Sequence, residues 1–268
     1  MPQNSKNWWD EFLVILERSF KDSYRNPFYL RSRFFMVLLI SLLTCSVYHD
    51  LGYSYTDAYS KAGFIFFSWS NFMTLNYFGT AVSIVREKQV LVKEYRNQTY
   101  GVVPYYFARM WIELPFTIFL GLMFWLINYF SVGLDEDFSK FSLFVLTLSL
   151  LILCSSALGV VVGTISNDEK VAIALGTLSN GALMIFSGYI INLDHVYVWI
   201  RWLQYLCPTR YAAEILLRNE FEDNPKYSFN PMNTYNLNFG TLNWLIMLTL
   251  ITWGLRVISI IALKRSIK

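Results

Sequence analysis

Six long apolar runs divide this chain, at about residues 34–51, 62–85, 104–131, 141–165, 170–191 and 241–263. An α-helix needs about 20 apolar residues to cross the ~30 Å hydrocarbon core of a bilayer. Hydrophobic residues make up 55% of the sequence and charged residues only 15%, whereas soluble domains carry about 25% charged residues. The sequence therefore predicts an all-α membrane protein with six transmembrane helices.

The segment before the first run, residues 7–24, has the pattern of an amphipathic helix. Its apolar side chains recur at helical spacing with charged residues between them, and they are Trp8, Phe12, Leu13, Ile15, Leu16 and Phe20. A helix of this kind lies in the membrane interface and does not cross the bilayer. The first 31 residues contain no apolar stretch typical of a cleavable signal peptide, so we expect the first run to direct insertion.

Charged residues flank the apolar runs in alternation. The basic flanks are Arg25, Arg31 and Arg33, then Arg86, Lys88, Lys93 and Arg96, and finally Lys264, Arg265 and Lys268; the acidic flanks are Asp50, Asp57, Asp135, Glu136 and Asp137. Basic residues accumulate on the cytoplasmic side of a membrane, so both termini are expected to be cytoplasmic. We expect the plasma membrane, with an organelle membrane as the alternative, and no nucleic-acid partner.

Residues 192–240 are then external, and the stretch Phe186–Phe221 has an unusual pattern. It begins as the end of an apolar helix, breaks at Ser187-Gly188, and continues as Trp- and Tyr-rich segments around Pro208. These segments are too polar to span lipid, and backbone that enters the membrane without crossing must be buried in protein or line a cavity. The sequence therefore predicts an external re-entrant segment, with residues 199–211 as a cap over a gate.

Residues 86–100 form a charged, helix-compatible connection between the second and third runs. Glu87 and Glu94 are seven residues apart and so share one helix face. This stretch is either a solvated loop or a docking helix for a cytoplasmic partner. Nearby, Arg109 and Glu113 form an i,i+4 pair inside the third run, where charges are costly unless they are paired. The pair either neutralises itself or acts as a polar relay between docking site and pore.

Catalytic and metal sites are poorly supported. The two histidines, His49 and His195, lie at the external ends of runs, and no serine has a His or Lys partner at a matching depth. No GxxxxGK[ST] phosphate-binding loop occurs. We therefore expect no catalytic, cofactor or metal site. Gly159 and Gly163 form a GxxxG motif, which we expect to support helix contact within the fold more than a dimer seam.

The whole chain resembles the ABC-2 type transmembrane domain of ABC transporters, closest to the G subfamily of white and multidrug-resistance half-transporters. The weaker matching motifs are RSFKDSYRNP, AGFIFF and Glu113-Leu114-Pro115, and the most specific are IFSGYIINL and WIRWLQYLCPTRYAAEILLRNEF. The resemblance implies one ABC-2 exporter domain over residues 1–268, working as a homo- or heterodimer with a second transmembrane domain. It also implies a nucleotide-binding ATPase domain as partner, which would hold ATP and Mg.

The resemblance assigns roles to particular positions. The implied substrate cavity comprises Asn71, Phe72, Thr177, Gly181 and Met184; the external valve is Tyr189 and Ile190; the ATPase coupling residues are Glu87, Glu94 and Tyr95. Relatives often have two leucines at the valve and a larger residue at the position of Gly181.

The resulting hypothesis is the permease domain of an ATP-driven exporter of lipid, sterol or hydrophobic compounds. Relatives carry an ATPase domain on the same chain and none is recognised here, so it would reside on another chain or on a missing N-terminal part. The alternatives are a non-transporting membrane scaffold or remnant domain, and an intramembrane hydrolase acting through Ser187. Cys207 is expected either free or bridged to another chain.

Overall fold

The computed structural model describes residues 8–25, 27–97, 100–135, 137–191, 196–222, 224, 227 and 241–267. Within these residues the regular structure is entirely helical. The elements are α1 (Trp8–Arg25), α2 (Pro27–Val47), α3 (Tyr55–Arg96), α4 (Val102–Val132), α5 (Phe138–Ile165), α6 (Glu169–Ile185), α7 (Val198–Arg201), η2 (Trp202–Leu206), α8 (Pro208–Phe221) and α10 (Thr241–Ile267).

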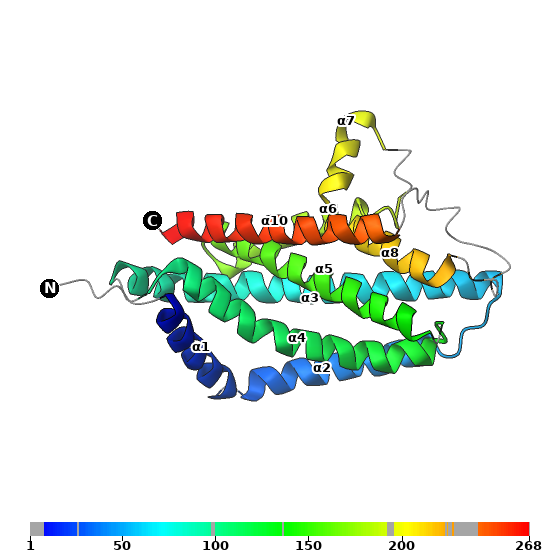
Figure 1. Cartoon of the computed structure of the whole chain (residues 1–268), viewed down its shortest axis with the longest axis horizontal. Helices are drawn as coiled ribbons and strands as arrows, with labels where there is room; N and C mark the ends of the chain where they lie inside the picture. The colour runs from blue at the N-terminus through cyan, green and yellow to red at the C-terminus, as the bar shows by residue number, and fades with distance from the viewer. Residues whose placement is uncertain are drawn as a thin grey trace.

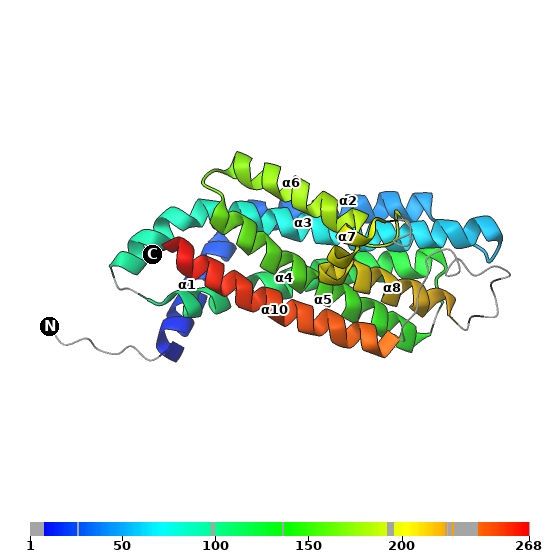
Figure 2. The same ribbon diagram turned by 90° about the horizontal axis from the view of Figure 1, so that it is seen from above.

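The long helices α2, α3, α4, α5, α6 and α10 run side by side along one axis, while α1 lies crosswise at one end (Figures 1 and 2). We call this the α1 end; it also contains the last turns of α3, α5 and α10 and the first turns of α4. The opposite end, which contains α8, is the α8 end. A crosswise amphipathic helix beside a bundle of apolar helices is the arrangement that the sequence predicts.

The expected all-α membrane fold is confirmed, and each of the six apolar runs overlaps one long helix, although runs 34–51 and 170–191 extend beyond the ends of α2 and α6. Three of these helices, α4, α5 and α10, are long and apolar enough to cross a membrane by length and composition alone. Helix α6 has 17 residues, just below the ~20 that a crossing needs, and α3 carries more polar residues. The six-span count therefore remains a prediction.

Helix α3 is much longer than the second apolar run. It has 42 residues, or roughly 63 Å at 1.5 Å per residue, about twice the thickness of the hydrocarbon core. Ser54 caps its first turn, because its hydroxyl accepts from the Asp57 amide while the Asp57 carboxylate accepts from the Ser54 amide. The charged stretch 86–96 is the last segment of this one helix, so the docking element of the hypothesis is continuous with the second span.

The GxxxG motif packs α5 against α3, as predicted, within the fold. A Cβ atom at Gly159 would lie 2.5 Å from the backbone oxygen of Tyr77, and one at Gly163 would lie 2.6 Å from that of Ala81. Only glycine permits this backbone approach. The contact holds α3 and α5 together along the centre of the bundle.

The re-entrant segment differs in detail from the prediction. Helix α8 is buried on nearly all sides and packs against α3, α5 and α10. By contrast, α7 and η2 project away from the bundle (Figure 1) and expose Val198, Trp199 and Trp202. The element that packs into the bundle is thus 208–221. Of the expected cap at residues 199–211, only 208–211 belong to this packed helix, whereas the large apolar side chains of α7 and η2 lie outside the bundle. The cap itself stays a prediction.

Candidate functional site

A groove of about 340 Å³ opens at the α1 end between α1, the end of α3 and the start of α4. Its charged lining residues are Arg18, Arg86, Glu87, Glu94, Arg109 and Glu113. The sequence prediction separated two of these as a relay and two as coupling residues. The fold brings all four together around one groove.

Glu94 connects α3 to α1 and to the connection before α4. It accepts a hydrogen bond from the Arg18 guanidinium at 2.7 Å and another from the Tyr100 hydroxyl. Burial raises the pKa of Glu94, but the hydrogen bonds from Tyr100 and Arg18 outweigh that effect and lower it. Glu94 is therefore an ionised, partly exposed carboxylate that ties three segments together.

Glu87 has the same function two turns earlier on α3. It accepts from Arg109 and from Tyr105, both of α4. Arg109 also contacts Glu113 at 3.3 Å and Ser83 of α3. The Arg109 side chain is 9% exposed, so it is a buried charge held between two carboxylates, which is the pairing that a charge at this depth requires.

Tyr95 is partly buried in the apolar cluster of this end, where it lies with Ile15 of α1. A further contact fixes α1 against α4, because the Gly101 amide at the start of α4 donates to the Glu11 carboxylate at 2.9 Å. A carboxylate is favourable at a helix N-terminus. Helix α1, the end of α3 and the start of α4 are thus joined by apolar packing and by charge.

The five residues assigned to the substrate cavity do not share one environment. Phe72 is 3% exposed and packs against Phe124 and Trp125 in the core of the bundle. Asn71, the residue before Phe72 on α3, is partly exposed. A groove of about 400 Å³ does follow one face of α3, but its lining runs from Thr74 to Arg86 and includes none of the five.

The α6 residues lie on or beside an open face. Thr177 is exposed, and a Cβ atom at Gly181 would meet nothing within 4 Å. Met184 is partly buried against the core. Between them, Asn180 is buried and donates to Thr74 of α3 at 3.1 Å. The open face of α6 thus sits beside α3, on the side that the resemblance assigns to the cavity.

The two residues assigned to the external valve also lie in different environments. Tyr189 stacks on Phe66 of α3 with ring centroids 4.5 Å apart, whereas Ile190 is exposed. The neighbouring Ser187 is buried; its hydroxyl donates to the Met184 carbonyl at 2.6 Å and accepts from the Tyr189 amide. The hydroxyl therefore helps to end α6 in the described structure. His195 and residues 228–240 lie outside the described residues.

Comparison with known proteins decides the family. The sequence profile of the ABC-2 type transporter family matches residues 10–221, most of the chain. The chain belongs to this family. It is 30% identical over 212 residues to the bovine (Bos taurus) protein named broad substrate specificity ATP-binding cassette transporter ABCG2, covering 77% of this chain and 32% of that protein.

Two further relatives place the similarity in the same subfamily. Protein white of Drosophila melanogaster is 25% identical over 216 residues, or 81% of this chain and 31% of the relative. ABC transporter G family member 7 of Arabidopsis thaliana is 24% identical over 238 residues, or 89% of this chain and 32% of the relative. The chain spans about a third of the length of these relatives, so it corresponds to the membrane domain of an ABC transporter.

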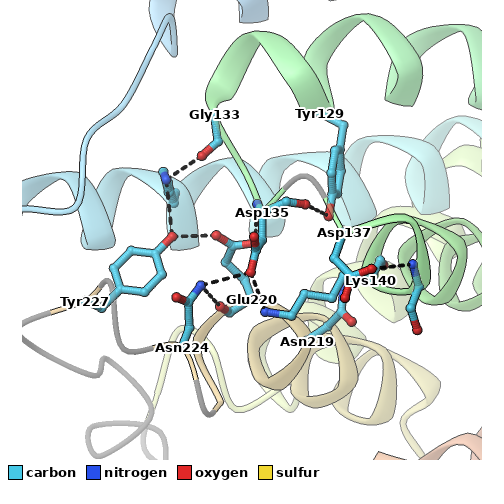
Figure 3. A network of polar contacts seen from close by, with 11 residues as sticks. Tyr129, Gly133, Asp135, Asp137, Lys140, Asn219, Glu220, Asn224 and Tyr227 are labelled. Atoms are coloured by element: carbon cyan, nitrogen blue, oxygen red, sulfur yellow. Dashed lines mark hydrogen bonds and ion pairs between the residues drawn. The ribbon is translucent and has the colours of Figure 1, made fainter.

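A polar cluster that the sequence patterns did not predict lies at the α8 end of this ABC-2 domain (Figure 3). Glu220 of α8 accepts from the Tyr227 hydroxyl and from the Asp135 amide, and Lys61 donates to the same Tyr227 hydroxyl at 3.2 Å. Lys140 pairs with Asp135 at 2.7 Å. Lys61, at the start of the second apolar run, and Glu220, in the specific RNEF motif, were the available signals.

Glu220 is an unusual carboxylate in this cluster. Burial raises its pKa, and the Tyr227 hydrogen bond only partly opposes that shift. The cluster links α3, the α4–α5 connection and α8. It therefore holds α8 in place against the bundle.

The sequence analysis also missed Arg256, which lies in the interior of α10 and is 7% exposed. The signal was plain: it is a single arginine within the last apolar run. A charge in such a position marks a functional site by default.

Proposed function

We propose that this ABC-2 domain forms half of the membrane pathway of an ATP-driven exporter of lipid, sterol or other hydrophobic compounds. The family supports a transporter, and one relative is named for broad substrate specificity. The apolar and aromatic side chains exposed along α2, α4 and α10 suit a domain that contacts lipid on several sides. They do not by themselves define the compound.

The observation that carries the proposal is the continuity of α3. One helix contains the Thr74 contact to α6 and, about four to six turns further along at 3.6 residues per turn, Glu87 and Glu94 at the α1 end. A force applied to the end of this helix moves the segment beside the open face of α6. Packed elements of this kind have discrete arrangements, which is what alternating access requires.

The energising partner is a nucleotide-binding domain, on another chain or elsewhere in the same protein, which would bind ATP and Mg. It would dock at the groove of the α1 end, where Arg86 and Glu87 are exposed. This places the α1 end in the cytoplasm, with α1 in the membrane interface, six crossings and both termini cytoplasmic. The open face of α6 would meet a second transmembrane domain, with Thr177 and Gly181 at the shared cavity.

Charge reversal at the docking groove tests this function. Glu94→Lys in the complete transporter should leave ATP hydrolysis measurable while outward transport of a hydrophobic dye falls severalfold, because the introduced ammonium would repel Arg18. The matched control is Glu17→Lys, which makes the same charge change on an exposed α1 position. Equal transport per ATP in both variants, or the absence of any co-purifying ATPase, would instead support a non-transporting scaffold.

The cavity assignment has its own test. Thr177→Ala and Met184→Ala should change the relative transport rates of two hydrophobic compounds while surface expression stays constant. Leu178, exposed on the same helix, serves as the comparison position. Unchanged preference in both variants would remove the assigned cavity while leaving the docking proposal intact.

A further inference from the structure

Arg256 is a buried cation without an acidic partner in the described part of the chain. Its guanidinium donates to the Tyr106 hydroxyl at 3.0 Å and to the Ser156 hydroxyl at 2.7 Å. Both acceptors are neutral, so these hydrogen bonds solvate the charge without cancelling it. A buried charge in a membrane protein is costly unless a charge of opposite sign approaches it.

Arg256 lines a small cavity enclosed by five helices. The cavity has a volume of about 30 Å³, and its charged lining residues are Arg33, Arg109, Glu113 and Arg256. Three arginines and one glutamate thus face the same space. Arg109 already shares Glu87 and Glu113, so the cavity supplies no carboxylate for the positive charge of Arg256.

A second observation points to a missing acceptor. The Nε atom of Arg109 is buried and has no hydrogen-bond partner among the described residues. Buried donors are nearly always paired. An acceptor that entered this cavity could satisfy a group that the protein alone leaves open.

The cavity adjoins the surface of the bundle at Gly79. This glycine lines both the cavity and the groove along α3. A guanidinium nitrogen of Arg33 lies 3.8 Å from the position that a Cβ atom of Gly79 would occupy. The cavity is therefore reached from the side of the bundle, past Arg33, at a point where no bulky side chain stands on α3.

Size and charge together restrict the ligand. A water molecule needs about 10–15 Å³ of such space, so only one or two oxygen atoms fit, and they must be the tip of a larger molecule. One uncompensated guanidinium matches one negative charge. Guanidinium groups bind phosphate oxygens with good geometry, and basic pockets between transmembrane helices on the cytoplasmic side receive lipid head groups.

We propose that this cavity binds the phosphodiester of an anionic phospholipid from the leaflet at the α1 end. Two phosphate oxygens enter between Arg256 and Arg109, and the acyl chains stay in the bilayer beside α2 and α3. The lipid is a resident ligand and not the transported compound. The proposal therefore stands or fails separately from the exporter function.

The test measures lipid retained by the complete protein, purified in detergent with its ATPase unit, by native mass spectrometry. Phosphatidylglycerol, phosphatidylcholine and inorganic phosphate are the three probes. We expect phosphatidylglycerol to bind and to raise the melting temperature. Arg256→Gln should weaken this binding about tenfold or more, the size of a lost charged hydrogen bond. Arg256→Lys should retain part of it.

The matched control is Arg265→Gln, which removes the same charge from an exposed position at the end of the same helix; it should leave binding unchanged. If Arg256→Gln does not fold, Arg33→Gln supplies the second test and should also weaken binding. The proposal is overturned if phosphatidylcholine binds as tightly, if inorganic phosphate alone stabilises the protein, or if Arg265→Gln weakens binding equally. Wild-type protein that retains no phosphatidylglycerol would overturn it as well.

Discussion

Each end of the bundle contains a network of hydrogen bonds around one glutamate, but the two glutamates differ in exposure and in the direction of their pKa shift. At the α1 end, Glu94 is partly exposed, pairs with Arg18 and has a lowered pKa. At the α8 end, Glu220 is 2% exposed, relies on neutral donors and has a pKa raised by burial. The first network is a set of ionised groups beside an open groove. The second is a closed polar core.

This difference indicates which end can exchange partners. A partly exposed ion pair contributes little to stability and can be replaced by another charge at small cost. A buried carboxylate whose donors all come from the same chain is expensive to disturb. The α1 end is thus suited to docking, and the α8 end to holding α8 in place while the other end moves.

Truncating the two glutamates gives the largest contrast. Glu220→Ala leaves the Tyr227 hydroxyl and the Asp135 amide without the buried carboxylate that accepts from them, so we expect a loss of about 2–6 kcal/mol in the free energy of unfolding, at roughly 1–3 kcal/mol for each unsatisfied buried donor. Glu94→Ala should cost no more than about 1 kcal/mol, because its pair is half exposed. Denaturant unfolding in a fixed detergent measures both. Similar losses at the two ends would contradict the comparison.

Deleting a single tyrosine hydroxyl at each end is a finer test of the difference between the two ends. Tyr227→Phe removes one donor from buried Glu220 and an acceptor from Lys61, and should cost about 1.5–3 kcal/mol, the range for hydrogen bonds to charged groups. Tyr100→Phe removes the equivalent donor from Glu94, where water and Arg18 compensate, and should cost about 0.5–1 kcal/mol. The same unfolding measurement applies, and a larger loss for Tyr100→Phe would reverse the assignment of the two ends.

How much of this followed from the sequence depends on the element. The apolar runs predicted the six long helices, because burial in lipid demands runs of a given length, and the amphipathic pattern of residues 7–24 predicted α1. The burial of α8 could not be read from its composition, since PTRYAAEILLRNEF contains four charged residues. Those charges are tolerated because they have partners in the fold: Glu214 pairs with Arg218. Glu220 accepts from the Asp135 amide and the Tyr227 hydroxyl, and Asp135 is distant from it in sequence.

The candidate site could likewise be predicted only in part from the sequence. Glu87, Glu94, Arg109 and Glu113 were each predicted from local spacing, but their meeting around one groove depends on how α1 packs across α3 and α4. Phe72 and Asn71 are neighbours in sequence, yet one is buried in the core and the other is partly exposed. Position within a motif did not determine which way each side chain faces.

The pH dependence of stability should have opposite signs at the two ends. The raised pKa of Glu220 means that its contribution falls as pH rises from the ordinary carboxylate range through the raised value. The lowered pKa of Glu94 means that its contribution is present above the ordinary value and is lost as pH falls through the lowered one. Glu220→Gln should flatten the first arm of a melting-temperature profile, and Glu94→Gln the second. If either variant flattens the other arm, the assigned shift is wrong.

The smallest expected effect is chemical and concerns Cys207, directly before α8. It is 5% exposed, and burial raises the pKa of its thiol to about 11. Because the thiolate is the nucleophile, maleimide labelling at pH 7.5 should be much slower than for a free cysteine introduced at exposed Tyr197. Glu220→Ala should speed labelling of Cys207 if the polar core holds α8 in place, whereas Glu94→Ala should not. Rapid labelling of Cys207 in the wild-type protein would show that the α8 end opens as readily as the α1 end, and the contrast between them would then be one of charge alone.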